Sequence, residues 1–328
     1  LQPTGDGWVL PLEVRALTAT LPGREEARTQ LVEGYVVWME QHQHDWSTML
    51  AEQPVWSRAI NIALELPLVE AFLYFAGWTA GSGGFYHRQG DHETRSRLLA
   101  QAASLLEGQE PSLAGWIRYH YGSLLREQGN LAEGARELEQ SVALADAEGL
   151  ESEAAMARGE LASTRMLQGE LDEAIDLFHQ KLEVLQRLNV PREFARTCGE
   201  LAEVLVLKRA YEDAVALLEQ KLQLVKAMGD TRAEALTLTT LGDVQAERGD
   251  LKGAISRYQQ ALPVLEASDR RNAAVARANL GIYQRDVGDL SGALESFRYA
   301  LEVFQAYRLP QATEVARFIQ ALSGAPEH

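Results

Sequence analysis

The stretches LGDVQAERGDLKGAISRYQQAL (residues 241–262) and LGIYQRDVGDLSGALESFRYAL (residues 280–301) share one pattern and lie 39 residues apart. Each begins with a Leu-Gly pair, has a Gly-Asp pair at its centre, and carries apolar residues at helical spacing on both sides. Glycine at a helix end supplies a left-handed cap, and aspartate is a preferred first residue of the next helix. Each stretch therefore predicts two helices joined by a tight turn.

The same turn recurs along most of the chain. A glycine followed by Asp, Asn or Glu separates two helical patterns at Gly90-Asp91, Gly129-Asn130, Gly169-Glu170, Gly249-Asp250 and Gly288-Asp289, and Arg209-Ala210 takes this place in one further repeat. A small residue stands seven positions before each turn, and the set is Gly83, Gly122, Ala162, Ala202, Gly242 and Gly281. The spacing of 39 or 40 residues predicts six helix–turn–helix repeats.

Two further positions predict how the helices of a repeat pack. Five residues after the turn glycine (or Arg209) stand Arg95, Gly134, Ala174, Ala214, Ala254 and Ala293, and four residues later stand Leu99, Leu138, Phe178, Leu218, Tyr258 and Phe297. Small residues let two helices approach closely, and a large one fills the space between neighbouring repeats. Arg95, Lys181 and Lys221 stand where a small residue is expected, so the local packing at these three positions stays open.

These positions resemble the signature of the tetratricopeptide repeat. The matching residues are Leu241, Gly242, Ala254, Tyr258 and Ala261, then Leu280, Gly281, Ala293, Phe297 and Ala300. The resemblance covers residues 68–308. It implies an all-α, right-handed superhelical solenoid of six repeats, in which the first helix of each repeat lines a concave groove that binds a partner.

The two ends of the chain fall outside the repeats. Residues 309–328 predict a C-terminal capping helix over 309–323, which would cover the open end of the solenoid, followed by a frayed tail. Residues 1–67 predict a short extended stretch, a helix after Pro11, and helices at about residues 24–43 and 54–66.

Parts of the N-terminal segment resemble bacterial STAND regulators, which are signal-transducing ATPases with numerous domains. Val9–Arg15 (VLPLEVR) is similar to the end of their winged helix, without its histidine, and residues 52–66 (EQPVWSRAINIALEL) are similar to the helical arm before their repeats. The resemblance implies that this chain is the C-terminal sensor of such a regulator. Because the sequence begins with Leu1 and not with methionine, we expect it to be a fragment of a longer protein.

Composition narrows the classes of partner. A net charge of −16, from 47 acidic and 31 basic residues, repels phosphate backbones, so we expect no nucleic-acid partner. No apolar run reaches the ~18 residues of a membrane helix, so we expect no membrane partner. One cysteine, Cys198, excludes an internal disulfide and favours a reducing, cytoplasmic location.

The sequence lacks the motifs of catalysis. It contains no G-x-x-x-x-G-K-[ST] loop, H-E-x-x-H motif or G-x-S-x-G elbow, and its seven histidines are dispersed. Gly81-Ser82-Gly83-Gly84 is rich in glycine but is not followed by lysine, and we interpret it as close helix packing or a helix break. We therefore expect no enzymatic activity, no cofactor and no bound metal.

The resemblance also locates candidate binding residues. Groove-facing side chains of such repeats lie six, three and two positions before the small signature residue, and one, four and five positions after it. At or near these positions we select His87, Arg88, Trp116, Tyr119, His120, Ser123, Arg126, Glu160, Ser163, Met166, Arg196, Glu200, Glu203, Asp243, Asn279 and Arg285 as the candidate site.

Two features of this set suggest the chemistry of a partner. Trp116 and Tyr119 of the second repeat, together with Trp78, Phe85 and Tyr86 near His87 and Arg88 of the first, form the densest aromatic cluster, and aromatic residues often anchor partners. Packing of these rings between helices is the alternative. The acidic residues of the set would concentrate negative potential and favour a segment with lysine or arginine, whereas a solvated charged face is the alternative.

Three classes of function follow from these observations. The first is a sensor that binds a protein, a peptide or an inducer within a STAND-type regulator. The second is a free-standing scaffold that assembles a protein complex. The third is a small-molecule receptor, which predicts a closed pocket near Trp116 in place of an open groove.

Overall fold

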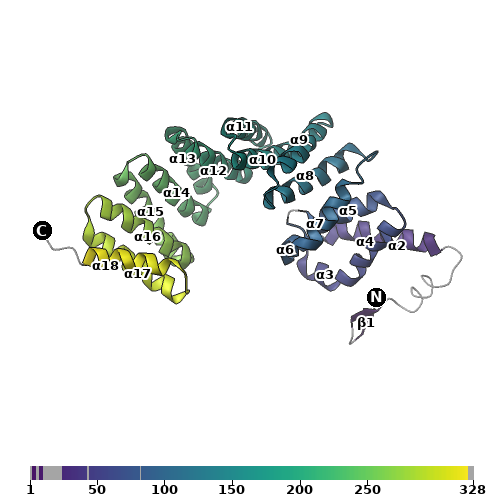
Figure 1. Ribbon diagram of the computed structural model, residues 1–328, viewed down its shortest axis with the longest axis horizontal. Coiled ribbons are helices and arrows are strands. Elements are labelled where there is room, and N and C mark those ends of the chain that lie inside the picture. The colour runs from purple at the N-terminus through teal and green to yellow at the C-terminus, as the bar shows by residue number, and fades with distance from the viewer. Residues whose placement is uncertain (1, 5–6, 10–23, 43, 82, 324–328) are drawn as a thin grey trace. The chain divides into compact units, whose positions relative to one another are not determined.

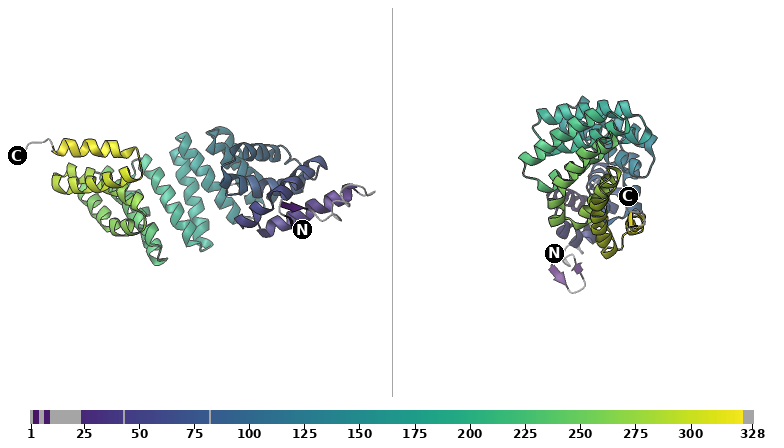
Figure 2. Two further views of the ribbon diagram at one scale, coloured as in Figure 1. Left: turned by 90° about the horizontal axis from the view of Figure 1, so that it is seen from below. Right: turned by 90° about the vertical axis from the view of Figure 1, so that its left-hand side faces the viewer.

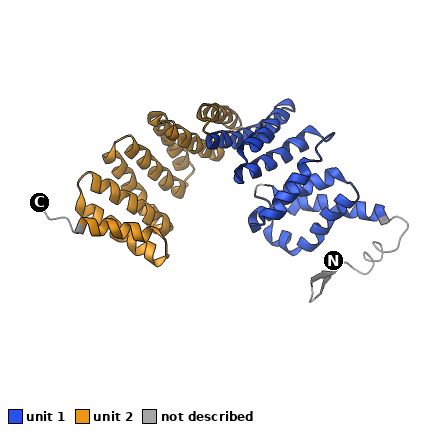
Figure 3. Cartoon of the chain, viewed as in Figure 1, with its two compact units in different colours: residues 1–168 blue, residues 169–328 orange. Residues whose placement is uncertain are grey.

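The computed structural model describes residues 2–4, 7–9, 24–42, 44–81 and 83–323 (Figure 1). They form two compact units, Leu1–Gln168 and Gly169–His328, which we describe separately (Figure 3). Most of these residues lie in α-helices that pack against the next helix in the chain, so the predicted all-α architecture of helix pairs is confirmed. Within the described ranges, no helix combines the length and apolarity needed to cross a bilayer.

The first unit starts with two short antiparallel strands, of which the second coincides with the predicted extended stretch and the first was not predicted. The strands are β1 (Gln2–Thr4) and β2 (Gly7–Val9), and the helices are α2 (Arg24–His42), α3 (Trp46–Ala51), α4 (Gln53–Glu65), α5 (Val69–Ala80), α6 (Phe85–Gln89), α7 (His92–Ala103), α8 (Pro111–Glu127), α9 (Leu131–Ala147) and α10 (Glu151–Gln168). The helices predicted at residues 24–43 and 54–66 are α2 and α4. The helix predicted after Pro11 lies outside the described residues.

Helix α3 was not predicted, and Asp45 accounts for it. The Asp45 carboxylate accepts hydrogen bonds from the backbone N–H groups of Ser47 (3.1 Å) and Thr48 (3.2 Å) and from both hydroxyls, which satisfies donors that a helix start leaves free. Hydrogen bonds from Thr48 and Ser47 lower the pKa of Asp45 to about 2.

The N-terminal helices and the first two repeats share one apolar core. Trp56, Phe72, Leu99 and Ile117, from four different helices, are all fully buried in it. The Trp56 indole N–H donates to the carbonyl of Met49 at 2.9 Å, so the ring is buried with its polar atom satisfied. The predicted boundary at residues 67–68 falls in the turn between α4 and α5.

The second unit consists of helices alone among its described residues. They are α11 (Leu171–Arg187), α12 (Pro191–Leu207), α13 (Tyr211–Ala227), α14 (Thr231–Glu247), α15 (Leu251–Ser268), α16 (Arg270–Asp286), α17 (Leu290–Ala306) and α18 (Gln311–Ser323). Helix α18 packs along α17 and places Val315 and Phe318 against the buried Phe297 and Phe304 (Figures 1 and 2). The predicted capping helix is thus present from Gln311, while the tail at 324–328 lies outside the described residues.

Every predicted turn glycine adopts the left-handed backbone conformation. The φ angles of Gly90, Gly129, Gly169, Gly249 and Gly288 lie between +72° and +92°. Arg209 takes the same conformation with φ of +62°, although it has a side chain. The carboxylates of Asp91, Asp250 and Asp289 accept a hydrogen bond from the third backbone N–H of the following helix, whereas Asn130 and Glu170 make no such bond.

The first helix of the first repeat is broken. Helix α5 ends at Ala80, and the chain turns through Gly81 to Gly84 before α6 begins. The interpretation of this segment as a helix break is confirmed. The prediction that Gly83 is the close-packing residue is wrong, because Gly83 has φ of +75° and a Cβ atom there would meet nothing within 4 Å.

Candidate binding site

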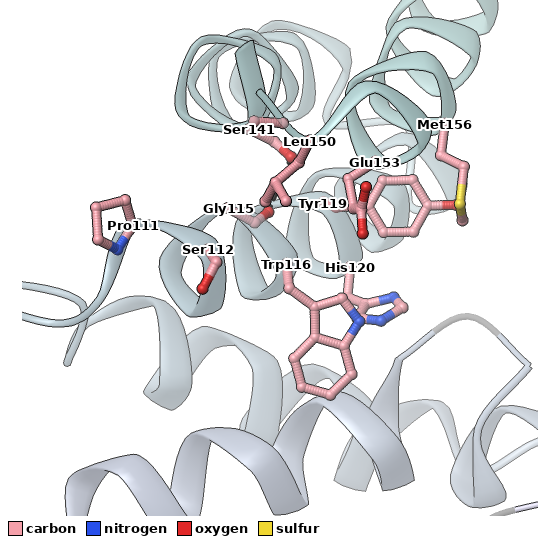
Figure 4. A pocket seen from close by; sticks show the side chains of 11 residues that line it. Pro111, Ser112, Gly115, Trp116, Tyr119, His120, Ser141, Leu150, Glu153 and Met156 are labelled. Atoms are coloured by element: carbon pink, nitrogen blue, oxygen red, sulfur yellow. Dashed lines mark hydrogen bonds between the residues drawn. The ribbon is translucent and has the colours of Figure 1, made fainter. Parts of the chain in front are cut away.

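A pocket of about 250 Å³ lies in the first unit, where α8 meets the end of α9 and the start of α10 (Figure 4). We call it the Trp116 pocket. Its lining consists of Pro111, Ser112, Gly115, Trp116, Tyr119, His120, Ser141, Ala145, Leu150, Glu153 and Met156. Three of the predicted site residues, Trp116, Tyr119 and His120, therefore meet at one cavity.

The local sequence explains why three rings lie close together on α8. Pro111 occupies the first turn, where its missing N–H is tolerated, and so fixes where the helix begins. Residues three and four positions apart share a helix face, which places Tyr119 and His120 beside Trp116. The centroid of the His120 ring lies 5.2 Å from that of Trp116 and 5.0 Å from that of Tyr119.

Gly77 on α5 and Gly81 directly after this helix make room for two of these rings. A Cβ atom on Gly77 would lie 2.3 Å from the Trp116 ring, and one on Gly81 would lie 2.9 Å from the His120 ring. Figure 4 shows Trp116 and His120 projecting from α8 to the same side. Both the two rings and the two glycines are four residues apart, so two rings of α8 pack onto Gly77 and Gly81 at the end of α5. One side of these rings packs against the glycines, and another side lines the pocket.

Arg95 completes the support behind these rings. It is fully buried, its Nε donates to the carbonyl of Ala80 at 2.8 Å, and its guanidinium forms an ion pair with Glu127. Because α5 stops at Ala80, that carbonyl has no continuing helix to bond to. The broken helix therefore explains why an arginine replaces the expected small residue.

His120 carries no charge at neutral pH. Burial, with a smaller contribution from the Arg95 guanidinium, lowers its pKa to about 3. Glu153 is exposed in the first turn of α10 and is the one charged residue among those that line the pocket.

Sequence reasoning missed Met156, although a signal was present. Met156 lies six residues before Ala162, as Trp116 lies six before Gly122, so both occupy one position of the repeat. The Met156 side chain is 51% exposed at the pocket. Glu153 and Leu150 carry no such signal, because their place at the pocket depends on how α10 packs on α8.

The remaining predicted residues of the first unit do not line this pocket. His87 and Arg88 are exposed on α6, and Phe85 and Tyr86 next to them pack their rings against Trp56. Packing is therefore the role of Phe85 and Tyr86.

Further along the first unit, most of the predicted side chains bond within the protein. Arg126 forms an ion pair with Glu160 at 3.0 Å, and the Ser163 hydroxyl donates to the carbonyl of Gly159 at 3.0 Å. Ser123 is buried, and Met166 is half-buried. The charges of Arg126 and Glu160 therefore compensate each other.

In the second unit, several of the predicted acidic residues are already paired. Glu200 contacts Arg196 at 2.5 Å and the buried Lys181 at 3.4 Å. Glu203 is exposed on the next turn of α12. Lys181 thus occupies the place of a small residue by directing its ammonium group to Glu200.

Asp243 and Asn279 belong to a hydrogen-bond network that sequence reasoning did not foresee. The hydroxyls of Tyr258 (2.5 Å) and Tyr283 (2.9 Å) donate to the Asp243 carboxylate, and the Asn279 amide donates to the Tyr258 oxygen at 3.0 Å. Burial, followed by the charge of Asp243, raises the pKa of both tyrosines. Arg285 pairs with Asp286 at 2.7 Å and lies over the Phe318 ring.

Two further groups complete the survey of reactive side chains. Cys198 is fully buried on α12, and burial raises the pKa of its thiol to about 11. Burial also lowers the pKa of Lys221 on α13, whose side chain lies against Gly199 of α12. In the part of the chain that the structure describes, no group of three or more His, Cys, Asp or Glu side chains is placed to hold a metal ion.

Comparison with known proteins identifies the repeats. Models of the tetratricopeptide repeat match residues 157–191 and 193–267, while no curated protein matches the sequence significantly. Among solved structures, a Signal Transduction ATPase with Numerous Domains (STAND) protein with a tetratricopeptide repeat sensor from Pyrococcus horikoshii is similar, with 15% identity and a TM-score of 0.70. The match covers 95% of this chain and 49% of that protein, so this chain spans about half of its length.

Two other solved structures are similar over most of their length. The apo form of the quorum sensor NprR from B. thuringiensis matches with 15% identity and a TM-score of 0.58, covering 87% of this chain and 80% of NprR. A Rap protein in complex with Competence and Sporulation Factor matches with 14% identity and a TM-score of 0.55, covering 88% of both chains. The chain thus contains tetratricopeptide repeats, and helix pairs of the same kind continue on both sides of the matched residues.

Proposed function

We propose that this chain is a non-catalytic sensor that binds a segment of a partner protein or a peptide, and that the Trp116 pocket anchors it. The observation that carries the proposal is this pocket, which combines aromatic and apolar walls with few polar groups. Ligand pockets typically have this composition, and interface anchors are often large apolar side chains that fill such a cavity. A tetratricopeptide array suits this role, and the similar Rap protein was solved with a factor bound.

The pocket's position suggests how binding could be sensed. Its lining comes from α8 and α9 on one side and from the start of α10 on the other, so an occupant would contact two successive repeats. An occupant that fits one arrangement of these helices better than another shifts the population toward it, in proportion to the difference in affinity. Repeat arrays transmit such shifts because each repeat contacts only its neighbours.

We further propose that the sensor belongs to a cytoplasmic STAND-type regulator. Two observations support this assignment: the VLPLEVR and EQPVWSRAINIALEL segments, and a fold similar to that of a STAND protein with a tetratricopeptide repeat sensor. A phosphate-binding G-x-x-x-x-G-K-[ST] loop upstream in the same reading frame is expected. A complete gene without that loop would favour the free-standing scaffold instead.

A small-molecule receptor is the second candidate, and the pocket's size favours it. A volume of about 250 Å³ is slightly below the usual range of small-molecule sites, which begins near 300 Å³, and it suits a ligand of one or two rings. Both candidate ligands would occupy the Trp116 pocket. A peptide or protein segment would also extend beyond the pocket, whereas a small molecule would not.

Selection from a peptide library tests the first candidate. Peptides selected on the wild-type chain should bind at least about tenfold more weakly to the Tyr119→Ala, Met156→Ala double variant, because anchor residues typically contribute more than about 1.4 kcal/mol. The matched control is Leu207→Ala, which removes an equally exposed apolar side chain from α12 (57% against 51% for Met156) and should leave the affinity unchanged. Equal loss in both variants, or in neither, would contradict the proposal.

A further inference from the structure

We infer that the Trp116 pocket selects a cationic occupant, namely a peptide segment in which a lysine or arginine adjoins an aromatic or large apolar side chain. This inference rests on the proposed function, because it names the chemistry of the ligand for that same site. It depends on three properties of the pocket: its walls, its one lining carboxylate, and the ion pairing of the arginines Arg95, Arg118 and Arg158.

The walls suit an apolar body with an adjacent positive charge. Trp116, Tyr119, Met156, Leu150 and Ala145 give aromatic and apolar surface. The faces of Trp and Tyr rings attract ammonium and guanidinium groups through the ring quadrupole, an effect of about 0.5–2 kcal/mol. Trp116 and Tyr119 are both half-buried, so part of each ring is open to an occupant.

The one charge on the lining is negative. Glu153 is exposed in the first turn of α10, and no lysine or arginine occurs among the residues that line the pocket. A carboxylate beside apolar walls favours an occupant whose cation can reach it while the rest of the occupant is buried.

Three arginines on α7, α8 and α10 are paired with carboxylates. The His120 imidazole stays neutral at physiological pH because burial lowers its pKa to about 3. Arg118 pairs with Glu137 at 2.6 Å, Arg158 pairs with Asp146 at 2.6 Å, and Arg95 pairs with Glu127. Among the described residues that line the pocket, a positively charged ligand would therefore meet no lysine or arginine.

The helix dipoles oppose this preference, but they are the smaller effect. The N-terminal ends of α8 and α10 both lie at the pocket, and each carries the equivalent of about half a positive charge. Glu110 precedes α8, and Glu151 and Glu153 lie in the first turn of α10. The carboxylates of Glu110 and Glu153 alone exceed two half charges, so the local potential remains negative.

Three indoles of similar size and different charge test the inference: tryptamine (cation), 3-propylindole (neutral) and indole-3-acetate (anion). Titration of the full chain, followed by saturation-transfer NMR, should give the tightest binding for tryptamine and the weakest for indole-3-acetate, with about three- to tenfold between successive probes at low salt. Glu153→Gln should reduce the preference for tryptamine over 3-propylindole at least threefold, and the part that remains reflects the ring faces of Trp116 and Tyr119. Glu203→Gln, which removes an exposed carboxylate from α12, is the matched control and should leave the preference unchanged.

The outcomes separate this inference from the function on which it rests. If 3-propylindole binds and is lost in Tyr119→Ala, Met156→Ala, the pocket is a binding site whatever its charge preference. If indole-3-acetate then binds as tightly as tryptamine, or if Glu153→Gln leaves the preference intact, the inference about charge is wrong. If no indole binds at millimolar concentration, the pocket is not a site for aromatic ligands, and both the inference and the proposed function fail.

Once tryptamine has been shown to bind, matched peptides identify the source of the cation. An acetylated, amidated peptide with Phe-Lys at its centre should bind more tightly than the same peptide with Phe-Gln. If only a peptide with a free N-terminal phenylalanine binds, the internal lysine or arginine named above is wrong and the pocket recognises an α-ammonium group.

Discussion

The first repeat and the later repeats use glycine for different purposes. In the last two repeats, a glycine on the first helix accommodates a ring from the second helix of the same repeat. A Cβ atom on Gly242 would lie 2.8 Å from Tyr258, and one on Gly281 would lie 2.7 Å from Phe297. In the first repeat, Gly77 and Gly81 accommodate Trp116 and His120, which belong to the next repeat.

This difference separates packing from site formation. A ring that packs against a glycine of its own repeat is buried on all sides, as Phe297 is. Trp116 packs on a neighbouring repeat and keeps part of its surface open to the pocket. The irregular first repeat therefore supplies a wall against which the second repeat presents its rings, and its broken helix requires Arg95 as an additional support.

The largest expected effect comes from removing that support. Arg95→Leu leaves the Ala80 carbonyl without its donor and the solvent-accessible Glu127 carboxylate without its partner, and a buried acceptor left unsatisfied costs up to about 3 kcal/mol. Urea denaturation should show this loss in the free energy of unfolding. The control, Arg97→Leu, removes an exposed arginine from the same helix and should change it by less than about 0.5 kcal/mol. Equal effects would mean that the broken helix does not need Arg95.

Alanine at the two kinds of glycine sharpens the comparison. Gly77→Ala places a methyl group against the Trp116 ring and should lower the free energy of unfolding by about 3 kcal/mol. Gly281→Ala places one against the Phe297 ring and should lower it by a similar or smaller amount. Only Gly77→Ala should also weaken the binding of 3-propylindole, because only Trp116 lines the pocket. The matched control is Gly34→Ala on α2, where a Cβ atom would meet nothing within 4 Å, so a gain of about 0.5–1 kcal/mol is expected. Unchanged binding in Gly77→Ala would contradict the link between packing and pocket.

The rings also differ in how they respond to acid. His120 titrates, whereas Phe297 does not. The pKa of the His120 imidazole is about 3 in the folded chain and about 6.5 in the unfolded chain. Between these pH values the unfolded chain therefore binds a proton that the folded chain does not. The free energy of unfolding is therefore highest above pH 6.5 and decreases as the pH falls below this value. At pH 5 it should be lower by roughly 2 kcal/mol.

Urea titrations at pH 7 and pH 5 measure that loss. The variant His120→Gln should be less stable at both values but should lose roughly 2 kcal/mol less between them. The same pH dependence in variant and wild type would show that His120 is not the group responsible.

The smallest expected effect concerns the one repeat turn without glycine. Arg209 adopts φ of +62°, a conformation that a residue with a Cβ atom takes at a cost. Arg209→Gly should therefore stabilise the chain by about 0.5–1 kcal/mol, a gain partly offset by the greater freedom of glycine when unfolded. Gly249→Ala makes the reverse change at φ of +92° and should destabilise it by about 1 kcal/mol. A stabilising Gly249→Ala would contradict this account of the turns.

The sequence predicted most of the fold because its turns restrict residue type. The left-handed backbone conformation favours glycine, so a glycine identifies all but one of the turns in the sequence. The fixed interval between turns then defines the repeat. It also placed Trp116, Tyr119 and His120 together, since spacing along one helix determines which residues share a face.

Contacts between helices could not be predicted in the same way. Asp243 was expected to be an acid open to a partner, yet hydroxyls from Tyr258 and Tyr283, on two other helices, donate to it. The contact of Arg95 with the Ala80 carbonyl likewise depends on where α5 ends. Such pairings have no fixed spacing in the sequence, so only the packed structure reveals them.

The buried thiol of Cys198 has a practical consequence for measuring how this protein moves. A protonated, fully enclosed sulfur reacts slowly with maleimides at neutral pH, so the native chain is in effect free of competing labels. Cysteines introduced at the exposed positions Ser152 and Arg271, one in each unit, could then carry a fluorophore pair without removal of Cys198. Energy transfer between them, recorded with and without tryptamine, would report directly whether an occupant changes the distance between the units.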